Sequence, residues 1–392
     1  MNILFLSGWF PYPPDNGSKL RIGSLLKGLA SRHDITLLSF ADQPEQALDK
    51  STALTFCRDV QIVPWKDYNP NNRRARLGFL DSRPRSMVDT YSPEMEERIC
   101  QTLTTRQYDV VIASQLTVAS YAHLFGGLPA LFEEAELGIF FEQFNNAKSV
   151  RRKLRHGLTW MKHRRYVANL LRYFQACTVV SERERELLKQ CAPKFQSIQV
   201  IPNCINLDEY SEQRVSVRPN TLVFTGSFRY FANHEAMVWF LSQVYPRIQA
   251  PIPDVRLTIT GDHGNLALPA ATNVSLTGFV AQVHPIIASS SVSLAPLLQG
   301  GGTRLKILEA MALRTPVVAT SKGAEGLDAT PEEHLLIADS AEDFARQVLR
   351  LLQDSQLHRR LADNAYRLVK EKYDWAKVTP RWLDLVEDIA RN

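Results

Sequence analysis

Short apolar runs alternate with amphipathic segments along the first half of the chain. The run at 2–7 ends in a loop rich in Pro and Gly, and residues 18–32 then place apolar side chains every three or four positions. This change of period predicts a short buried strand followed by a helix. Further apolar runs lie at 34–40, 60–65, 109–114, 130–134, 176–181 and 197–202. Such alternation indicates an open, mostly parallel α/β sheet with helices on both faces, whose ligands bind beyond the carboxyl ends of the strands.

A second series with the same pattern follows a polar stretch at 208–220. Its apolar runs lie at 221–225, 255–260, 274–276, 292–298, 316–319 and 335–338. Its helical patterns lie at 233–249, 303–313, 341–352, 356–371 and 378–390. Because a chain of 392 residues is long for one compact domain, the two series predict two α/β domains.

The stretch 296–320 brings glycines and positive charges together between two predicted strands. Three consecutive glycines, 300–302, precede a helical pattern, and glycine lets a ligand approach the backbone closely. The start of the helix offers unpaired N–H groups and the positive end of its dipole. Arg304 and Lys306 add two cations in the first turn, where cations are normally unfavourable. This stretch therefore predicts a phosphate site, and Glu309 is placed to accept hydrogen bonds from sugar hydroxyls.

These residues, with the motifs that follow them, resemble the donor-site signature of the group 1, family 4 glycosyltransferases. The matching pieces are the Leu-Glu-Ala-Met-Ala run at 308–312, Thr-Pro-Val-Val-Ala-Thr at 315–320, and Gly-Ala-Glu-Gly-Leu at 323–327. The run Gly-Thr-Arg-Leu-Lys before them is similar to that of some cell-surface polysaccharide transferases. The resemblance implies a retaining enzyme of the GT-B fold, in which two Rossmann-like domains face each other across a cleft. It implies an acceptor-side domain at 1–203, a donor domain at 204–375, and a last helix, 376–392, that returns to the first domain.

The resemblance also implies the residues of the donor site. Glu309 takes the position of the second family Glu, which binds the donor ribose, and Gly17 that of a glycine against the diphosphate. A turn residue at a helix start is an equal alternative for Gly17. The family contacts the nucleotide base through backbone groups near 278–280. The predicted donor-binding residues are Gly17, Gly226, Arg229, Gly278, Phe279, Gly301, Gly302, Thr303, Leu305 and Glu309.

The chain departs from the family pattern at three positions. Gly301 replaces the first Glu, while Ser227 and Asn233 stand where most members place an Arg and a Lys that hold the diphosphate. We expect Arg304 and Lys306 to supply the missing charge and to act on the leaving group. Arg229 is a rival for this role, and side chains that point to solvent along the helix are the alternative for both cations.

Three acidic residues follow the predicted strand at 130–134. Glu133, Glu134 and Glu136 lie at a strand end in an otherwise apolar setting, which suggests an acceptor-site base or sugar ligand. We expect Glu133 to be the catalytic member. A solvated loop explains the three side chains equally well.

No acidic residue occurs between Glu142 and Glu182, where basic residues alternate with apolar ones. The pattern predicts a basic amphipathic helix that could rest on an anionic membrane or reach a lipid-linked acceptor. The predicted membrane or acceptor surface is made of Arg151, Arg152, Lys153 and Arg155. A packed helix with a solvated basic face is the alternative. Nucleic acid is not expected as a partner, because no binding motif accompanies the charge.

The composition indicates the class of protein and its expected location in the cell. With 45% apolar and 22% charged residues and no apolar run of 18, the chain has the composition of a soluble globular protein. The first residues indicate a strand, not a signal peptide, and five cysteines without a CxxC spacing indicate free thiols. We therefore expect a cytoplasmic protein, peripheral on the inner face of the cell membrane. Because the chain has no Asp-x-Asp motif and the family includes metal-independent members, we expect no metal and no cofactor, with the nucleotide sugar as substrate.

Two other functions remain open at this stage. A nucleotide-sugar epimerase would use the same fold without an acceptor site, and a non-catalytic sugar-binding scaffold would have kept the fold after the loss of the first Glu. A NAD-dependent enzyme is not favoured, because the first strand leads to Pro-Tyr-Pro-Pro and not to a GxGxxG turn. The reaction that the resemblance implies is transfer of a hexosyl unit to an acceptor hydroxyl in the synthesis of a surface polysaccharide or glycolipid.

Overall fold

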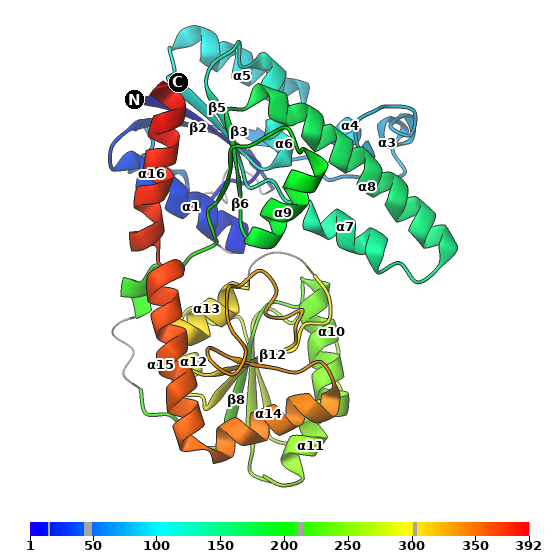
Figure 1. Cartoon of the computed structure of the whole chain (residues 1–392), viewed down its shortest axis with the longest axis vertical. Helices are drawn as coiled ribbons and strands as arrows, with labels where there is room; N and C mark the ends of the chain where they lie inside the picture. The colour runs from blue at the N-terminus through cyan, green and yellow to red at the C-terminus, as the bar shows by residue number, and fades with distance from the viewer. Residues whose placement is uncertain (15, 43–48, 211–214, 301–303, 392) are drawn as a thin grey trace. The chain divides into compact units, whose positions relative to one another are not determined.

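The described part of the chain forms two compact α/β units (Figure 1). The computed structural model describes residues 1–14, 16–42, 49–210, 215–300 and 304–391. The N-terminal unit consists of Met1–Pro202 together with Thr379–Asn392, and the C-terminal unit consists of Asn203–Val378.

The N-terminal unit is built on a parallel sheet with the strand order β3-β2-β1-β4-β5-β6-β7. Its strands are β1 (Asn2–Ser7), β2 (Asp34–Ala41), β3 (Asp59–Pro64), β4 (Val110–Ser114), β5 (Ala130–Glu133), β6 (Ala176–Val179) and β7 (Ile198–Val200). Each pair of neighbours is parallel, so the carboxyl ends of all these strands lie at one edge of the sheet. Because parallel strands need crossover connections, helices cover the sheet.

The helices of this unit differ greatly in length. They are α1 (Gly17–Ala30), α2 (Lys50–Leu54), α3 (Arg73–Leu77), α4 (Arg85–Asp89), α5 (Pro93–Thr105), α6 (Leu116–Ala119), α7 (Gly138–Asn145), α8 (Val150–Leu170) and α9 (Glu182–Cys191). The last helix, α16 (Trp375–Arg391), contributes residues 379–391 to the unit. It packs closely on α1, because a Cβ on Gly28 would lie 2.8 Å from Cγ2 of Thr379.

Both faces of this sheet are buried. Leu4 and Leu6 on β1 pack in a core with Leu38, and Ile3 and Phe5, which point to the other face, are equally inaccessible. Successive side chains of a strand point to opposite faces, so burial of all of them requires helices on both sides. This arrangement explains why the strands appear in the sequence as continuous apolar runs.

The C-terminal unit repeats this architecture with the strand order β10-β9-β8-β11-β12-β13. Its strands are β8 (Thr221–Thr225), β9 (Arg256–Thr260), β10 (Val274–Gly278), β11 (Val292–Ala295), β12 (Val317–Ala319) and β13 (Leu336–Ile337). Its helices are α10 (Phe231–Trp239), α11 (Tyr245–Gln249), α12 (His284–Ala288), α13 (Leu305–Ala312), α14 (Ala341–Gln353) and α15 (Ser355–Lys372), with a 3₁₀ turn at Leu207–Tyr210 and a π-helical turn at Phe240–Val244. Leu222 and Val223 lie in different core clusters on the two faces of the sheet. The two parallel sheets confirm the predicted α/β fold class.

Candidate functional site

Several glycines follow the strands at the carboxyl edge of the C-terminal sheet. Gly226, Gly261 and Gly278 come after or at the ends of β8, β9 and β10, all with positive φ. A Cβ on Gly261 would lie 2.6 Å from the carbonyl carbon of Gly226, so the first two turns touch through their backbones. Open parallel sheets bind ligands at this edge. The turns at Gly226 and Gly261 leave no room for a side chain, whereas the space beside Gly278 is open.

Lys306 fills the space beside the turn after β8. Its amine donates a hydrogen bond to Oδ1 of Asn233 at 2.9 Å, and Nζ lies 4.2 Å from the centre of the Phe224 ring. A Cβ on Gly226 would lie 2.9 Å from Nζ and 2.7 Å from Nδ2 of Asn233, and φ is +151° there. Residue 226 must therefore be glycine because the amine and the amide occupy the place of a side chain.

The surroundings of Lys306 change its ionisation. The pKa of the amine is lowered to about 7, mainly by burial and in part by the neighbouring charge of Arg304, while the charge of Glu309 opposes the shift. Because removal from water disfavours a cation, the amine changes its charge easily when an anion arrives. Such an amine is suited to bind a phosphate group as an ammonium ion.

Arg304 occupies the N-cap position of α13 and is only 7% exposed. Its guanidinium donates a hydrogen bond to the carbonyl of Gly300 at 2.7 Å. The solvent-facing alternative therefore describes neither cation of this helix. Gly300 has a φ of +105°, and a Cβ there would collide with the Tyr230 hydroxyl at 2.0 Å, so the loops after β8 and β11 meet at this glycine. The predicted donor residues Gly301, Gly302 and Thr303 lie outside the described residues.

Glu309 lies one turn after Lys306, on the same face of α13. Burial raises the pKa of its carboxyl, whereas Lys306 and a hydrogen bond from Tyr210 act in the opposite direction. Tyr210 in turn packs against His284, with ring centres 4.3 Å apart and the ring planes tilted by 34°. Sequence reasoning missed Tyr210, because its position in a polar boundary segment gave no signal of a contact with a helix 100 residues later.

The remaining predicted donor residues differ in their surroundings. The side chain of Arg229 is 82% exposed and its Nε donates to Asp262 at 2.6 Å. Phe279 is 82% exposed, and the Gly278 carbonyl accepts a hydrogen bond from the N–H of Gly261 at 2.8 Å. Leu305 packs at the edge of an apolar cluster. An exposed guanidinium paired with a carboxylate is a weaker candidate for the diphosphate than Lys306, whereas an exposed ring beside a tight turn can stack on a base.

In the N-terminal unit, Glu133 is fully buried. Its Oε1 accepts a hydrogen bond from Nε of Arg21 at 2.7 Å, and its Oε2 accepts one from Oγ of Ser114 at 2.5 Å. Arg21 also donates to the carbonyl of Pro202 at 3.0 Å. Both carboxylate oxygens are thus engaged inside the protein, which argues against the catalytic role expected of Glu133. Arg21 comes from α1, whose first residue is the exposed Gly17.

The next residue, Glu134, has an unusual backbone. Its φ is +57°, and Gln115, at the end of the neighbouring strand β4, has a φ of +78°. Nε2 of Gln115 donates to Oε2 of Glu134 at 3.2 Å. Burial raises the pKa of the Glu134 carboxyl to about 8, and the charge of Glu133 adds to the effect. Strained residues of this kind cluster at functional sites, so Glu134 is the better acceptor-side candidate of the two. Glu136 is exposed.

The basic segment forms one continuous helix, α8, which packs through Trp160, His163, Val167 and Leu170. The predicted surface residues Arg151, Arg152, Lys153 and Arg155 are all exposed. None of the helices in the described ranges is long and apolar enough to cross a membrane. In the same part of the chain, no group of three or more His, Cys, Asp or Glu side chains could hold a metal ion.

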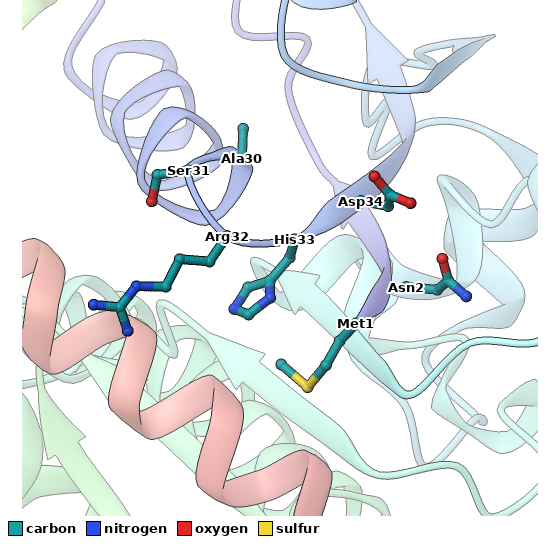
Figure 2. A pocket seen from close by; sticks show the side chains of 7 residues that line it. All are labelled: Met1, Asn2, Ala30, Ser31, Arg32, His33 and Asp34. Carbon is teal, nitrogen blue, oxygen red and sulfur yellow. The ribbon is translucent and has the colours of Figure 1, made fainter.

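A surface hollow of about 420 Å³ lies at the other edge of the N-terminal sheet, where β1 and β2 begin (Figure 2). Its lining residues are Met1, Asn2, Ala30, Ser31, Arg32, His33 and Asp34. Arg32 and His33 both approach Oε1 of Glu387 on α16, at 3.4 and 3.3 Å. Since it lies at the amino ends of the strands, this hollow is far from the edge where ligands of parallel sheets bind. The Arg32 guanidinium already faces a carboxylate of the same unit.

Each of the two units matches a family of known proteins. The family model described as Glycosyltransferase Family 4 matches residues 16–209, and that described as Glycosyl transferases group 1 matches residues 219–354. The chain is 22% identical to an uncharacterized 44.6 kDa protein in the cps region of Klebsiella pneumoniae, over 96% of this chain and 97% of that one. It is 28% identical to a phosphatidyl-myo-inositol mannosyltransferase of Mycolicibacterium smegmatis over 43% of this chain and 45% of that one.

Solved structures share the fold at lower identity. HepE of Anabaena in complex with UDP-glucose has a TM-score of 0.68 at 15% identity, over 99% of this chain and 100% of that one. Sucrose-phosphate synthase of Thermosynechococcus elongatus has a TM-score of 0.72 at 16% identity, over 99% of both chains. These likenesses confirm the GT-B fold, and the two family matches confirm the predicted family. The chain belongs to the group 1, family 4 glycosyltransferases.

Proposed function

We propose that this glycosyltransferase moves a hexosyl unit from a nucleotide-diphosphate sugar to an acceptor hydroxyl and retains the anomeric configuration. The observation that carries the proposal is the contact of Lys306 with Asn233 beside Gly226. Asn233 takes the position at which most family members keep a lysine for the diphosphate. The amine that this position lacks is supplied by α13, and Glu309 lies one turn further along the same face.

The chemistry requires that the departing diphosphate be neutralised as its charge grows. Arg304 and Lys306 are placed to meet this charge, with the ammonium held in a partly buried site where its field is strong. In a retaining transfer, the bond from the anomeric carbon to the phosphate oxygen breaks as the acceptor oxygen approaches on the same face. The acceptor proton passes to that phosphate oxygen, so neither a separate base nor a metal ion is needed. We therefore propose a metal-independent reaction.

The donor and the setting are inferred from similar proteins. HepE of Anabaena has been crystallised with UDP-glucose and with UDP and glucose, which supports a nucleotide sugar as donor. The Klebsiella relative is a protein of the cps region and the mycobacterial relative is a phosphatidyl-myo-inositol mannosyltransferase. We propose that the enzyme works in the synthesis of a surface polysaccharide or glycolipid, in the cytoplasm, with a glycan or lipid-linked acceptor. The exposed basic residues of α8 would then hold it at an anionic membrane surface.

A panel of UDP, GDP and ADP sugars tests this function without an acceptor. A transferase hydrolyses its donor slowly, an epimerase converts the donor to its epimer, and a scaffold protein does neither. The cognate donor at 100 times its Kd should raise stability by ~2.7 kcal/mol in a thermal-shift assay, which identifies it before activity is known. Hydrolysis that persists in EDTA supports metal independence, and nuclear magnetic resonance of the first-formed sugar product reports the anomeric outcome.

A further inference from the structure

The last residue of α3 and the loop that leads to α4 present three large apolar side chains to solvent. Leu77, Phe79 and Leu80 are 56%, 54% and 91% exposed. Single apolar residues at a surface are ordinary, whereas three within four positions form a patch, and exposed patches mark interaction sites. No part of the proposed donor chemistry uses this loop.

Contacts with neighbouring residues hold the loop in this conformation. The amine of Lys162 on α8 donates to the carbonyls of Gly78, Phe79 and Asp81 at 2.8, 3.1 and 2.7 Å. The guanidinium carbon of Arg85 lies 3.9 Å from the centre of the Phe79 ring. Because one ammonium satisfies three backbone carbonyls, the turn is fixed while Leu77, Phe79 and Leu80 each remain more than half exposed.

Helix α8 carries an apolar stripe that leads to the same place. Val150, Leu154, Leu158 and Met161 are 79%, 72%, 40% and 41% exposed, and their spacing of four, four and three residues places them on one helix face. Lys162 follows Leu158 by four positions, so the amine that holds the loop lies at the end of this stripe. Figure 1 shows α3 and α4 beside α8. The stripe and the loop therefore adjoin.

Positive charge surrounds this apolar surface. Exposed basic residues flank it on both elements: Arg73, Arg74 and Arg76 on α3, and Arg151, Arg152, Lys153 and Arg155 on α8. The sequence has no acidic residue from 143 to 181. A bilayer with anionic headgroups complements both properties at once, since it takes apolar side chains below the headgroups and attracts cations at its surface.

We propose that residues 77–80 form an insertion loop, which enters an anionic bilayer beside the apolar stripe of α8. This inference rests on the proposed membrane-associated function and adds an apolar contribution to the electrostatic one. Salt screens the attraction between charges but leaves apolar burial in place. Attachment of the parent protein should therefore persist in part at a salt concentration that abolishes purely electrostatic binding.

Tryptophan placed at the loop tip tests insertion directly. Leu80→Trp and the matched control Leu54→Trp, at a 51% exposed position on α2, are mixed with phosphatidylglycerol–phosphatidylcholine vesicles, and emission is compared with that of the parent. We expect a blue shift and quenching by brominated lipid for Leu80→Trp and no change for Leu54→Trp. Vesicle binding without a change in the introduced indole would overturn the proposal, as would the absence of any vesicle binding by the parent. Shielding of the indole by self-association without lipid would assign the surface to a protein partner and also overturn it.

Two sets of substitutions separate the apolar and charged contributions. Leu77→Ser with Leu80→Ser should leave binding at low salt nearly intact but release the protein at a several-fold lower salt concentration than the parent. Reversal of Arg151, Arg152 and Lys153 to Glu should abolish binding at low salt. Both proteins should keep the thermal shift with the cognate nucleotide sugar, measured without vesicles. If that thermal shift is absent from the parent, the proposed function fails. The vesicle measurements still test independently whether residues 77–80 insert into the bilayer.

Discussion

The amine of Lys306 lies 2.9 Å from the side-chain oxygen of Asn233, although 73 positions separate the two residues. The resemblance to the family implies a lysine at the position of Asn233. In this chain the cation comes from α13 and reaches the turn after β8, where it lies beside Asn233 at Gly226. Asn233, at the position of the family lysine, and the cation at 306 are thus in direct contact, which is what the proposal that Lys306 supplies the missing charge requires.

Arg304→Ala should lower turnover more than it weakens donor binding, because charge on the leaving group grows toward the transition state. A loss of ~10²–10³ in kcat is the scale for removing one such group from a preorganised site. Arg229→Ala is the matched control, since this side chain is 82% exposed and paired with Asp262. Steady-state kinetics with the cognate donor decide the matter. If Arg304→Ala kept near-parental turnover and Arg229→Ala were inactive, the cation that stabilises the leaving diphosphate would be Arg229, in the loop after β8, and not Arg304.

Donor binding should take up a proton above pH 7. Burial lowers the pKa of free Lys306 to about 7, and a bound diphosphate favours the charged amine and raises this pKa in the complex. At pH 6 the amine is already charged and no proton is needed, whereas at pH 8.5 binding must supply one, so affinity declines as pH rises above 7. Calorimetric titration of the nucleotide sugar in buffers of different ionisation enthalpy counts the protons. Lys306→Met should bind more weakly without proton uptake, and equal uptake by this variant would point to another group.

Glu309→Gln should keep the fold and weaken donor binding by roughly 1.5–3 kcal/mol, because the amide replaces a charged acceptor of the ribose hydroxyls. The comparison of Kd for the nucleotide sugar and for the corresponding 2′-deoxy nucleotide sugar isolates the contact. The parent should discriminate between them and the variant should not. Tyr210→Phe is a control for the hydrogen bond within the protein. Unchanged affinity of Glu309→Gln would remove the ribose role.

Glu133→Ala should destabilise the N-terminal unit by ~3–5 kcal/mol, since it leaves the buried Arg21 guanidinium without its carboxylate. Urea unfolding at pH 7 measures the loss. The double variant Arg21→Leu/Glu133→Leu removes both charges and should recover much of it. Without such recovery, the ion pair would not be the origin of the destabilisation.

Glu134→Gln should stabilise the protein increasingly as pH rises from 5 to 8.5. The carboxyl has a pKa near 4.3 in an unfolded chain and about 8 here. Between these values the folded protein binds a proton that the unfolded chain lacks, so the parent loses stability as pH rises through this window. The amide does not titrate, and the difference in Tm between variant and parent should widen with pH. Glu136→Gln, at an exposed position, should show no such trend. A difference that stays constant with pH would mean that Glu134 titrates normally.

The sequence alone determined the architecture and the family of this protein. Continuous apolar runs between amphipathic segments specify parallel strands buried on both faces, because a local period reports directly on which side chains must leave water. The glycines, cations and Glu309 of 296–320 carried the donor-site prediction in the same way, since they are contiguous in the chain. These features depend on neighbours within a few positions, and a sequence displays such neighbours.

Only the tertiary structure decided which of these groups meet and which are buried. Glu133 and Glu134 are adjacent residues of the same type. Glu133 is held by Arg21 from α1, whereas Glu134 lies in a strained conformation at the strand end beside Gln115. The five-residue helices α3 and α4 are too short to show a period, and the exposed loop between them is fixed by Lys162 from 81 or more positions away. Burial, pKa and exposure depend on contacts between distant segments. The free energy of those contacts is set by three-dimensional position, which no local pattern in the chain encodes.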